Sequence, residues 1–429
     1  MKNLLNKRGS FTVFLTMIFA AVMIMIWAVI WASGQVQISC MTKDFGRLWG
    51  RSILAEFDIN LKERYGLFGF YGNEVLVGEK LDFYSDYSFG SKDYISCGQA
   101  ECSLEGYSLA EPANMEKQIK EIVLYGIKPK PLFLPDMQPE TDELPAGAKE
   151  EHSIAADRYI NSRWIIEALP SEGNQTSVGI NSLIEKVKEG LSISSLTENA
   201  AEDIYIFRFF KDYMDSRELG ETYFNNEIEY IISGRLSDNK AKEKVYNNII
   251  ALRNAMNLAY LYGCDEKRNA AMAAAEIISP GPAAIAVQLI ILETWAFMEA
   301  KNDLKLLYDN KPVPIMKSDR SWALSLENVL STMSISEEQI STGEIQQEAD
   351  RNGYIKPPAE EGIDYENYLK ILTGALPREI KILRIMDLIQ INMKYLYCDY
   401  FLLEDYYTGL EFSLEVNGRT YEFEEKYQK

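Results

Sequence analysis

The first pattern along the chain is an unbroken apolar run. Between Arg8 and Lys43 lie 34 residues without a formal charge, and Phe11 to Ser33 is apolar almost throughout. As a helix this run spans about 34 Å, enough to cross the hydrocarbon core of a bilayer. A secretory signal cleaved near Ala32 is the alternative, but its apolar region is typically only about 7–15 residues long. We therefore predict a transmembrane helix over residues 11–33.

Cationic residues flank the run on both sides: Lys2, Lys7 and Arg8 precede it, and Lys43, Arg47 and Arg51 follow it. Lys7 and Arg8 lie close to the apolar residues, whereas the first cation after the run is about ten residues beyond Ser33, and the cations nearest a span tend to stay inside. The pattern predicts a cytoplasmic leader over residues 1–10. It predicts a single-pass protein of the cell membrane whose large C-terminal part is extracellular.

Helical periodicity continues after the run. Apolar residues recur at roughly helical steps from Met41 to Leu61, which predicts an amphipathic stalk helix that ends near Lys62. Phe45 and Trp49 lie on this stripe. If the stripe packs within its own domain, these two residues are ordinary core, and if it stays exposed, they form an assembly surface for other helices.

The period changes near both ends of the chain. Glycines and aromatic residues at 65–72 end the stalk and favour extended structure, and a strand-like run follows at 102–110. Residues 411–416 and 420–424 alternate between polar and apolar, and Asn417-Gly418 between them is a strong type I′ turn signal. The pattern predicts a β-hairpin that pairs with strands near residues 65–110, so that both chain ends share a small antiparallel sheet.

Between these ends the pattern is densely helical, for example over Ala283–Tyr308. The longest uninterrupted apolar piece there is only ten residues, which indicates a buried core helix and no second span. The fold class is therefore α+β and mostly α. The predicted regions after the span are a stalk helix with a small α/β region at 34–127, a proline-rich linker at 128–150, a helical domain at 151–396 and the C-terminal β-hairpin at 397–429.

Composition and charge exclude several functions. The chain of 429 residues has 44 basic and 64 acidic residues, a net charge of 44 − 64 = −20, which disfavours nucleic acid as a partner. A single histidine, His152, removes His-based triads and multi-His metal sites. Phosphate-binding loops and the usual hydrolase motifs are absent from the sequence. We predict no catalytic, cofactor or metal site, and adjacent acids are interpreted as solvated surface.

Five cysteines are present, and the only close pair is Cys97 and Cys102. A zinc site needs three or four ligands, which this pair does not supply. On the exported side of a membrane the pair is a candidate for a disulfide that closes a short turn. The alternative is that all five cysteines are unpaired thiols.

Several segments point to a family. The leader Lys7-Arg8-Gly9-Ser10 with the apolar run behind it resembles that of pilins, in which a prepilin peptidase cuts after the glycine. The chain also resembles single-span surface proteins of clostridia that accompany tight-adherence (Tad/Flp-type) pilus genes and share the leader of their pseudopilins. The segments that carry this resemblance are 9–15, 54–57, 65–68, 229–234, 295–297 and 386–390. It implies leader cleavage between Gly9 and Ser10, and pilin-like partner proteins.

One position departs from the pilin pattern. Pilins usually carry Glu as the fifth residue after the cut, where it pairs with a neighbouring subunit, and here that residue is Phe14. The departure argues against a major pilin and for a minor or assembly component of a Tad-type pilus without catalytic activity. An exported carbohydrate-active enzyme that uses paired acids, and an adhesion or binding module unrelated to pili, are the alternatives.

Overall fold

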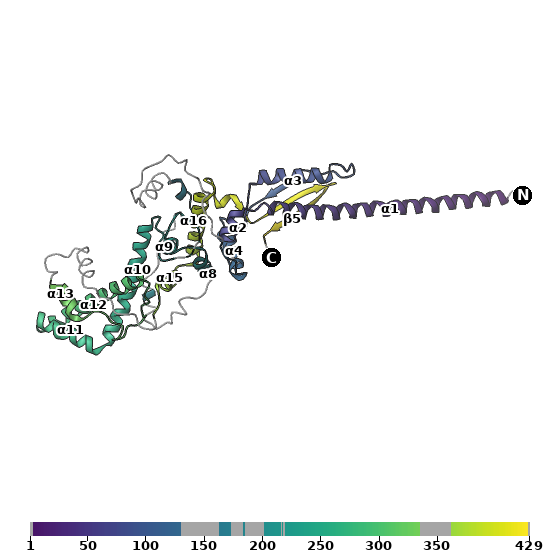
Figure 1. Ribbon diagram of the computed structural model, residues 1–429. Coiled ribbons are helices and arrows are strands. Elements are labelled where there is room, and N and C mark those ends of the chain that lie inside the picture. The colour runs from purple at the N-terminus through teal and green to yellow at the C-terminus, as the bar shows by residue number, and fades with distance from the viewer. Residues whose placement is uncertain are drawn as a thin grey trace, which may run out of the picture. The chain divides into compact units, whose positions relative to one another are not determined.

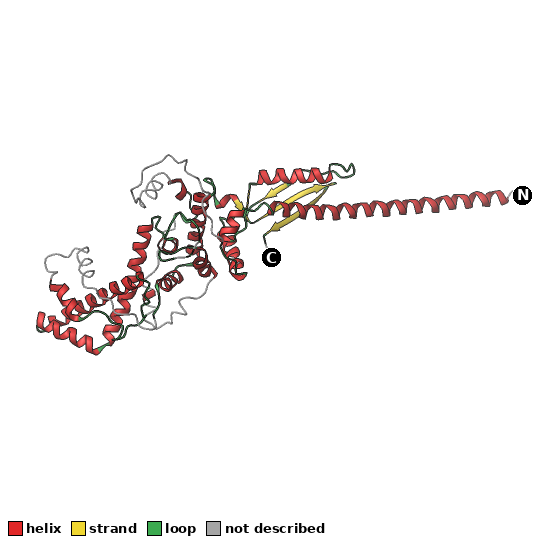
Figure 2. Ribbon diagram, in the orientation of Figure 1, coloured by secondary structure: helices red, strands yellow, loops and turns green. Residues whose placement is uncertain are grey.

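The computed structural model describes residues 3–129, 163–172, 183–184, 201–215, 217, 219–334 and 362–427. Most of the predicted linker at 128–150 lies outside these residues, as does His152. Within them the protein is mostly helical with small antiparallel sheets, which confirms the predicted fold class (Figures 1 and 2).

The chain forms two compact units, each assembled from separate stretches. Unit 1 consists of Met1–Ile59, Phe68–Asn114 and Leu402–Lys429, and unit 2 consists of Asn60–Leu67 and Met115–Phe401. Both chain ends therefore belong to unit 1. The sequence pattern predicts only contiguous regions, and it placed the two chain ends in separate regions, 34–127 and 397–429.

The N-terminal helix α1 is continuous over Asn3–Leu54. It ends before Lys62, where the predicted stalk ended. Phe57 instead forms an antiparallel bridge with Phe70, which is far outside the helix. The helix ends there because the backbone N–H and C=O groups near Phe57 form hydrogen bonds with the segment around Phe70. A second, short helix, α2 (Ile59–Tyr65), follows.

Unit 1 contains two small antiparallel sheets. β1 (Phe70–Tyr71) pairs with β3 (Tyr406–Tyr407), and β2 (Glu101–Ser103), β4 (Gly409–Val416) and β5 (Arg419–Lys426) form a sheet of order β2-β4-β5. β4 and β5 turn at Asn417 and Gly418, whose φ angles of 52° and 75° are the left-handed values that a type I′ turn requires. The predicted hairpin and its pairing with strands from the other end of the chain are confirmed.

One face of the three-stranded sheet carries the core of unit 1. Buried apolar residues alternate along β4 with more exposed polar ones. Two helices supply the other half of this core, namely α1 and α3 (Glu74–Phe89), which starts at the capping residue Asn73. The core residues include Trp49 and Ile53 of α1, Val77, Leu81 and Phe89 of α3, and Phe412, Leu414 and Phe423 of the sheet. Figure 1 shows α3 and the strands beside the C-terminal part of α1.

Unit 2 is built from helices in its described part. They are most of α4 (Pro112–Leu124), α8 (Ala201–Phe209), α9 (Glu227–Ser233), α10 (Asp238–Gly263), α11 (Asp265–Ile278), α12 (Ala283–Tyr308), α13 (Leu326–Ser334), α15 (Tyr365–Gly374) and α16 (Arg378–Leu396), with a 3-10 turn at Arg163–Ile166. A second 3-10 turn, Leu403–Asp405, belongs to unit 1. α12 starts and ends at the residues that the sequence pattern predicts.

Two helices in the described part of the chain, α1 and α12, are long and apolar enough to cross a membrane. In α12, 44% of the most apolar window is buried, and Ile291, Trp295 and Ala296 belong to a hydrophobic cluster of unit 2. In α1 the corresponding window is 0% buried. α12 is therefore a core helix, as predicted, and α1 is the candidate membrane span or signal sequence.

Candidate functional site

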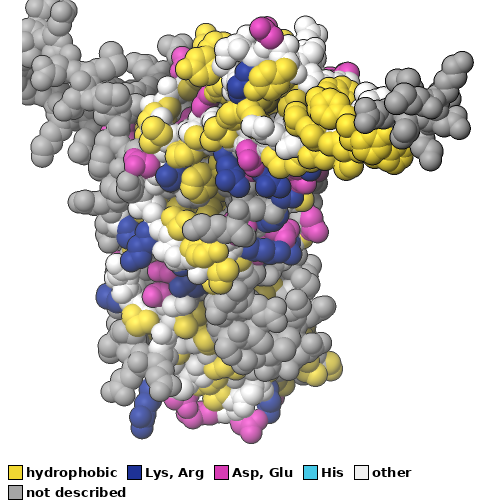
Figure 3. All heavy atoms as spheres, turned by 90° about the vertical axis from the view of Figure 1, so that its right-hand side faces the viewer, with side chains coloured by type: hydrophobic (Ala, Val, Ile, Leu, Met, Phe, Trp, Pro, Cys, Tyr) yellow, Lys and Arg dark blue, Asp and Glu magenta, His cyan; other side chains and the backbone are white. Residues whose placement is uncertain are grey.

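The N-terminal part of α1 is the most unusual surface of the described residues. Every residue from Phe11 to Ser33 is exposed, including Phe11 at 65% and Trp27 at 67%. Figure 3 views the molecule from the side on which α1 projects and shows apolar side chains gathered there. Leaving a large apolar side chain in water forgoes about 1.5–3 kcal/mol, so this segment requires lipid or other helices around it.

The candidate cleavage site lies inside this helix. Gly9 and Ser10 both belong to α1 and have helical backbone, and their side chains lie outside the described part of the structure. Nothing in the geometry separates them from the apolar run that follows. Cleavage of the leader after Gly9 stays a prediction.

Trp49 belongs to the core of unit 1, and the partly buried Phe45 packs against this core. Trp49 is only 4% exposed, and its ring contacts that of Phe89 at 5.6 Å between centroids, in an edge-to-face arrangement. Phe45 stacks on Trp49 at 6.2 Å and contacts Phe89 at 5.4 Å. The structure therefore corrects the reading of this pair as an exposed assembly surface. The helical spacing of Phe45 and Trp49 placed them on one apolar stripe. Only the position of α3 decided what covers that stripe.

The five cysteines are free in the structure, so Cys97 and Cys102 do not form the disulfide that their spacing suggested. Both pack, partly buried, against the core of unit 1. Burial, followed by the charge of Glu74, raises the pKa of Cys102 to about 12, and burial also raises the pKa of Cys97. Protonated thiols are weak nucleophiles and weak metal ligands, so these cysteines act as small apolar residues.

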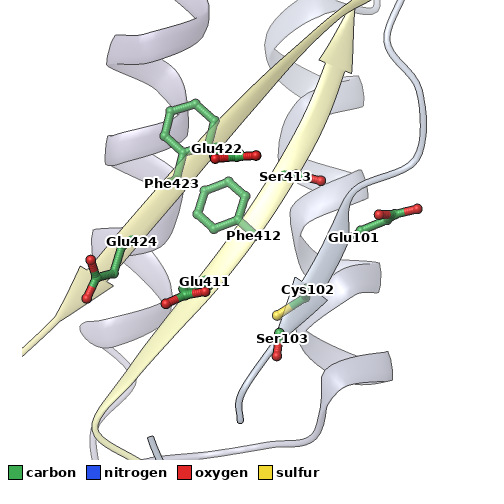
Figure 4. Close-up of a pocket in the computed structure, with 9 residues that line it drawn as sticks. All are labelled: Glu101, Cys102, Ser103, Glu411, Phe412, Ser413, Glu422, Phe423 and Glu424. Atoms are coloured by element: carbon green, nitrogen blue, oxygen red, sulfur yellow. The ribbon is translucent and has the colours of Figure 1, made fainter. Parts of the chain in front are cut away.

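The polar face of the three-stranded sheet is lined by acids. An open hollow of about 610 Å³ lies on this face, and Figure 4 shows its nine lining residues, among them Glu101, Glu411, Glu422 and Glu424. The hydroxyl of Tyr107 donates to Glu411 Oε1 at 2.8 Å and to Glu424 Oε1 at 3.0 Å. All four carboxylates are exposed to solvent. They form an open acidic surface and not an enclosed cleft.

Unit 2 contains acids that are buried. Glu229 on α9 is fully buried, and its Oε1 accepts hydrogen bonds from the Tyr365 hydroxyl at 2.8 Å and from the Tyr213 backbone N–H at 3.0 Å. Burial raises the pKa of Glu229 to about 7, and burial also raises the pKa of Asp212 to about 6. Such shifts occur in active sites and in structural polar networks alike. Here the partners of Glu229 are the hydroxyl of the buried Tyr365 and a backbone N–H, which favours a structural role.

A buried ionic network ties a loop to two helices of unit 2. The guanidinium of Arg253 (α10) donates to Asp303 (α12) at 2.8 and 3.0 Å and to the carbonyls of Pro314 and Ile315. Lys317 bridges Asp303 and Glu299, at 2.5 and 2.6 Å. Burial alone would raise the pKa of Asp303, but the two cations hold it below its usual value. Each charge has its counterpart, so the network positions the loop and has no group left over for chemistry.

The described residues contain no group of three or more His, Cys, Asp or Glu side chains that could hold a metal ion. Taken together, the geometry defines a mostly helical α+β protein in two units with an exposed apolar helix at its N-terminus.

A family model matches residues 152–418, more than half of the chain, and the chain belongs to this family, which is described as a family of unknown function (DUF5702). The match includes β4 and ends at the turn before β5, and α1 precedes it. Comparisons with curated proteins and with solved structures gave no match.

Proposed function

We propose that this protein is a membrane-anchored, pseudopilin-like minor or assembly component of a Tad-type pilus. Its role is structural, through contacts with the membrane and with other pilin-like proteins, and involves no catalysis. The N-terminus lies in the cytoplasm, residues 11–33 cross the membrane, and the chain from residue 34 onward lies outside the cell.

The observation that carries this proposal is the division of α1. Its N-terminal part is apolar and exposed on all sides, whereas its C-terminal part packs in the core of unit 1 against an antiparallel sheet. A single unbroken helix therefore joins a folded head to a segment that only lipid or other apolar helices can cover. This is the arrangement that a subunit needs if it waits in a membrane and then joins helices of its neighbours.

The charges support the orientation. The leader carries cations next to the apolar run, and the rest of the chain is strongly acidic. The cations closest to a span favour the cytoplasmic side. The leader motif at Gly9-Ser10 supports a pseudopilin, and Phe14 supports a minor component, because it lacks the carboxylate that a major pilin offers its neighbour.

The test is the N-terminal sequence of the protein purified from its own membrane, determined by mass spectrometry. A peptide that begins at Ser10 is the expected result. A peptide that begins near Gln35 would mean a cleaved secretory signal and a released protein, and would contradict the proposal. Protease added to intact, wall-stripped cells should digest both units, and protection until lysis would reverse the topology.

One observation keeps an enzyme as the second candidate. Because Glu411 and Glu424 share the hydroxyl of Tyr107, the oxygens that accept from it lie at most about 6 Å apart, close to the spacing of the two carboxyl groups in retaining glycosidases. Both side chains are exposed, however, whereas a general acid needs a raised pKa in a sheltered site. Hydrolysis of a polysaccharide by the purified chain, lost in Glu411→Gln, would favour the enzyme.

A further inference from the structure

α1 fixes which end of unit 1 faces the bilayer. The helix is unbroken from the apolar run into the core of unit 1, and Ile38 and Met41 already pack against that core. At 1.5 Å per residue, Ile38 lies roughly 8 Å beyond Ser33. The head-group region of a bilayer is about 5–8 Å thick on each side. If residues 11–33 cross the membrane, unit 1 begins where the head groups end.

Strand β5 shows which part of unit 1 lies at this level. Phe423 packs against Gly46, and the hydroxyl of Tyr427 donates to the carbonyl of Leu54. Four strand residues cover about 13 Å and eight helix residues about 12 Å, so β5 and α1 run side by side in the same direction. Figure 1 shows the two elements next to each other.

The same spacing locates the β4-β5 turn. Gly418 lies five strand residues before Phe423, about 16 Å nearer the N-terminus of α1. That distance corresponds to about eleven helix residues, which places the turn at the level of residue 35, just past Ser33. The turn therefore reaches the outer edge of the apolar run.

A loop is fastened to this turn. The backbone N–H of Asn417 donates to Ser96 O at 2.9 Å, and Ser96 N donates back to Asn417 Oδ1 at 2.8 Å. The Asn417 amide also donates to Tyr94 O at 3.1 Å. These bonds hold the loop 91–96 and the turn 417–419 together, and we call the two segments the membrane-proximal end of unit 1.

We propose that the membrane-proximal end rests on the lipid head groups, with the Tyr94 ring in the interface. Tyr94 is 62% exposed. Tyrosine concentrates at membrane interfaces because its ring is apolar and its hydroxyl forms hydrogen bonds with water. The charged groups of this end, Lys92, Asp93 and Arg419, leave a net charge of only 2 − 1 = +1. The contact is therefore with the interface itself and not specifically with acidic lipids.

This inference rests on the proposed function, because it requires that residues 11–33 are retained as an anchor. It adds that unit 1 is not joined to the membrane by a flexible linker. The rigid helix and the seated end together hold it in one orientation on the membrane, with the face of β2-β4-β5 that carries Glu411 and Glu424 away from α1 and open to partners.

The test uses the full chain in vesicles of phosphatidylcholine and phosphatidylglycerol at a ratio of about 7:3. A photo-crosslinking benzoylphenylalanine replaces Tyr94 in one variant and Tyr71 in a control variant. Tyr71 has almost the same exposure, 61%, but lies on β1 next to the bridge between Phe57 and Phe70, beyond the other end of α1. A second pair places the crosslinker at Arg419 and, as control, at Lys426 on the same strand.

We expect lipid adducts at Tyr94 and Arg419 to exceed those at Tyr71 and Lys426 by at least tenfold in mass spectra. Equal yields at probe and control positions would overturn the inference, as would adducts of Tyr94 to a second protein copy. Flotation of the same vesicles reports the anchor separately. Protein that does not float contradicts the proposed function, whereas protein that floats without preferential adducts contradicts only this inference.

Discussion

Glu229 illustrates how burial changes the behaviour of a single residue. Both polar groups that reach its Oε1 come from distant parts of unit 2, and Oε2 has no hydrogen-bond partner among the described residues. The carboxyl is thus better suited to its protonated form than to its charged form. Burial also raises the pKa of Asp212 to about 6, although this carboxylate accepts a local hydrogen bond from the Met214 backbone N–H at 2.7 Å.

We predict that Glu229→Gln stabilises the protein at alkaline pH. The pKa of Glu229 is about 7 in the folded chain against 4.5 as its ordinary value, so the unfolded chain releases this proton first. The contribution of this carboxyl to the free energy of unfolding is therefore fully present below pH 4.5 and is lost as the pH rises through about 7. Relative to wild type, the variant should gain about 2–3 kcal/mol between pH 5 and pH 8.

The measurement is urea unfolding of the full chain in micelles at both pH values. Tyr365→Phe is a useful companion, because it removes a donor to Glu229 and should raise the pKa further. A difference between Glu229→Gln and wild type that does not change with pH would show that Glu229 is ionised throughout.

At the scale of elements, helix α1 has two kinds of glycine. A Cβ added at Gly46 would overlap the ring of Phe423, whereas at Gly34 nothing lies within 4 Å. The sheet therefore approaches α1 closely at Gly46, and the absence of a side chain there is what lets β5 lie against the helix.

We predict opposite effects for alanine at these two positions. Gly46→Ala forces Phe423 away from its stacked partner Phe412 and should cost about 1–3 kcal/mol. Gly34→Ala meets no neighbour and should be neutral or stabilise the helix by about 0.5–1 kcal/mol. Hydrogen exchange of β5 in the full chain is the readout. Faster exchange in both variants, or in neither, would mean that Phe423 does not hold the sheet on α1.

At the scale of the whole molecule, the apolar segment of α1 is separate from the folded core of unit 1. The apolar segment of α1 contributes nothing to the core of unit 1, since all of its side chains are exposed. The residues of α1 that pack in the core of unit 1 begin at Ile38.

A chain that lacks residues 1–33 should therefore remain folded. We predict that it stays soluble, no longer floats with vesicles, and melts within about 2 °C of the full chain, because every side chain from Phe11 to Ser33 is exposed. Circular dichroism and flotation check this. Aggregation or a much lower melting temperature would show that the segment packs on the protein.

Local patterns determined a large part of this protein. The apolar run, the bounds of α12 and the turn at Asn417-Gly418 could all be predicted from neighbouring residues. These features depend on interactions between residues that are close in sequence, or on the character of one continuous stretch. The pairing of strands from both chain ends was also predicted, although these strands form two small sheets and not one.

Tertiary structure decided the rest, because burial and pairing depend on residues far away in sequence. The end of α1 at Leu54 follows from the bridge between Phe57 and Phe70, and the burial of Trp49 follows from the position of α3. Arg253 and Asp303 look like ordinary surface charges until the fold buries them together. The composition of unit 1 was also decided by the tertiary structure. Its three segments come from opposite ends of the chain, and only their shared core brings them together.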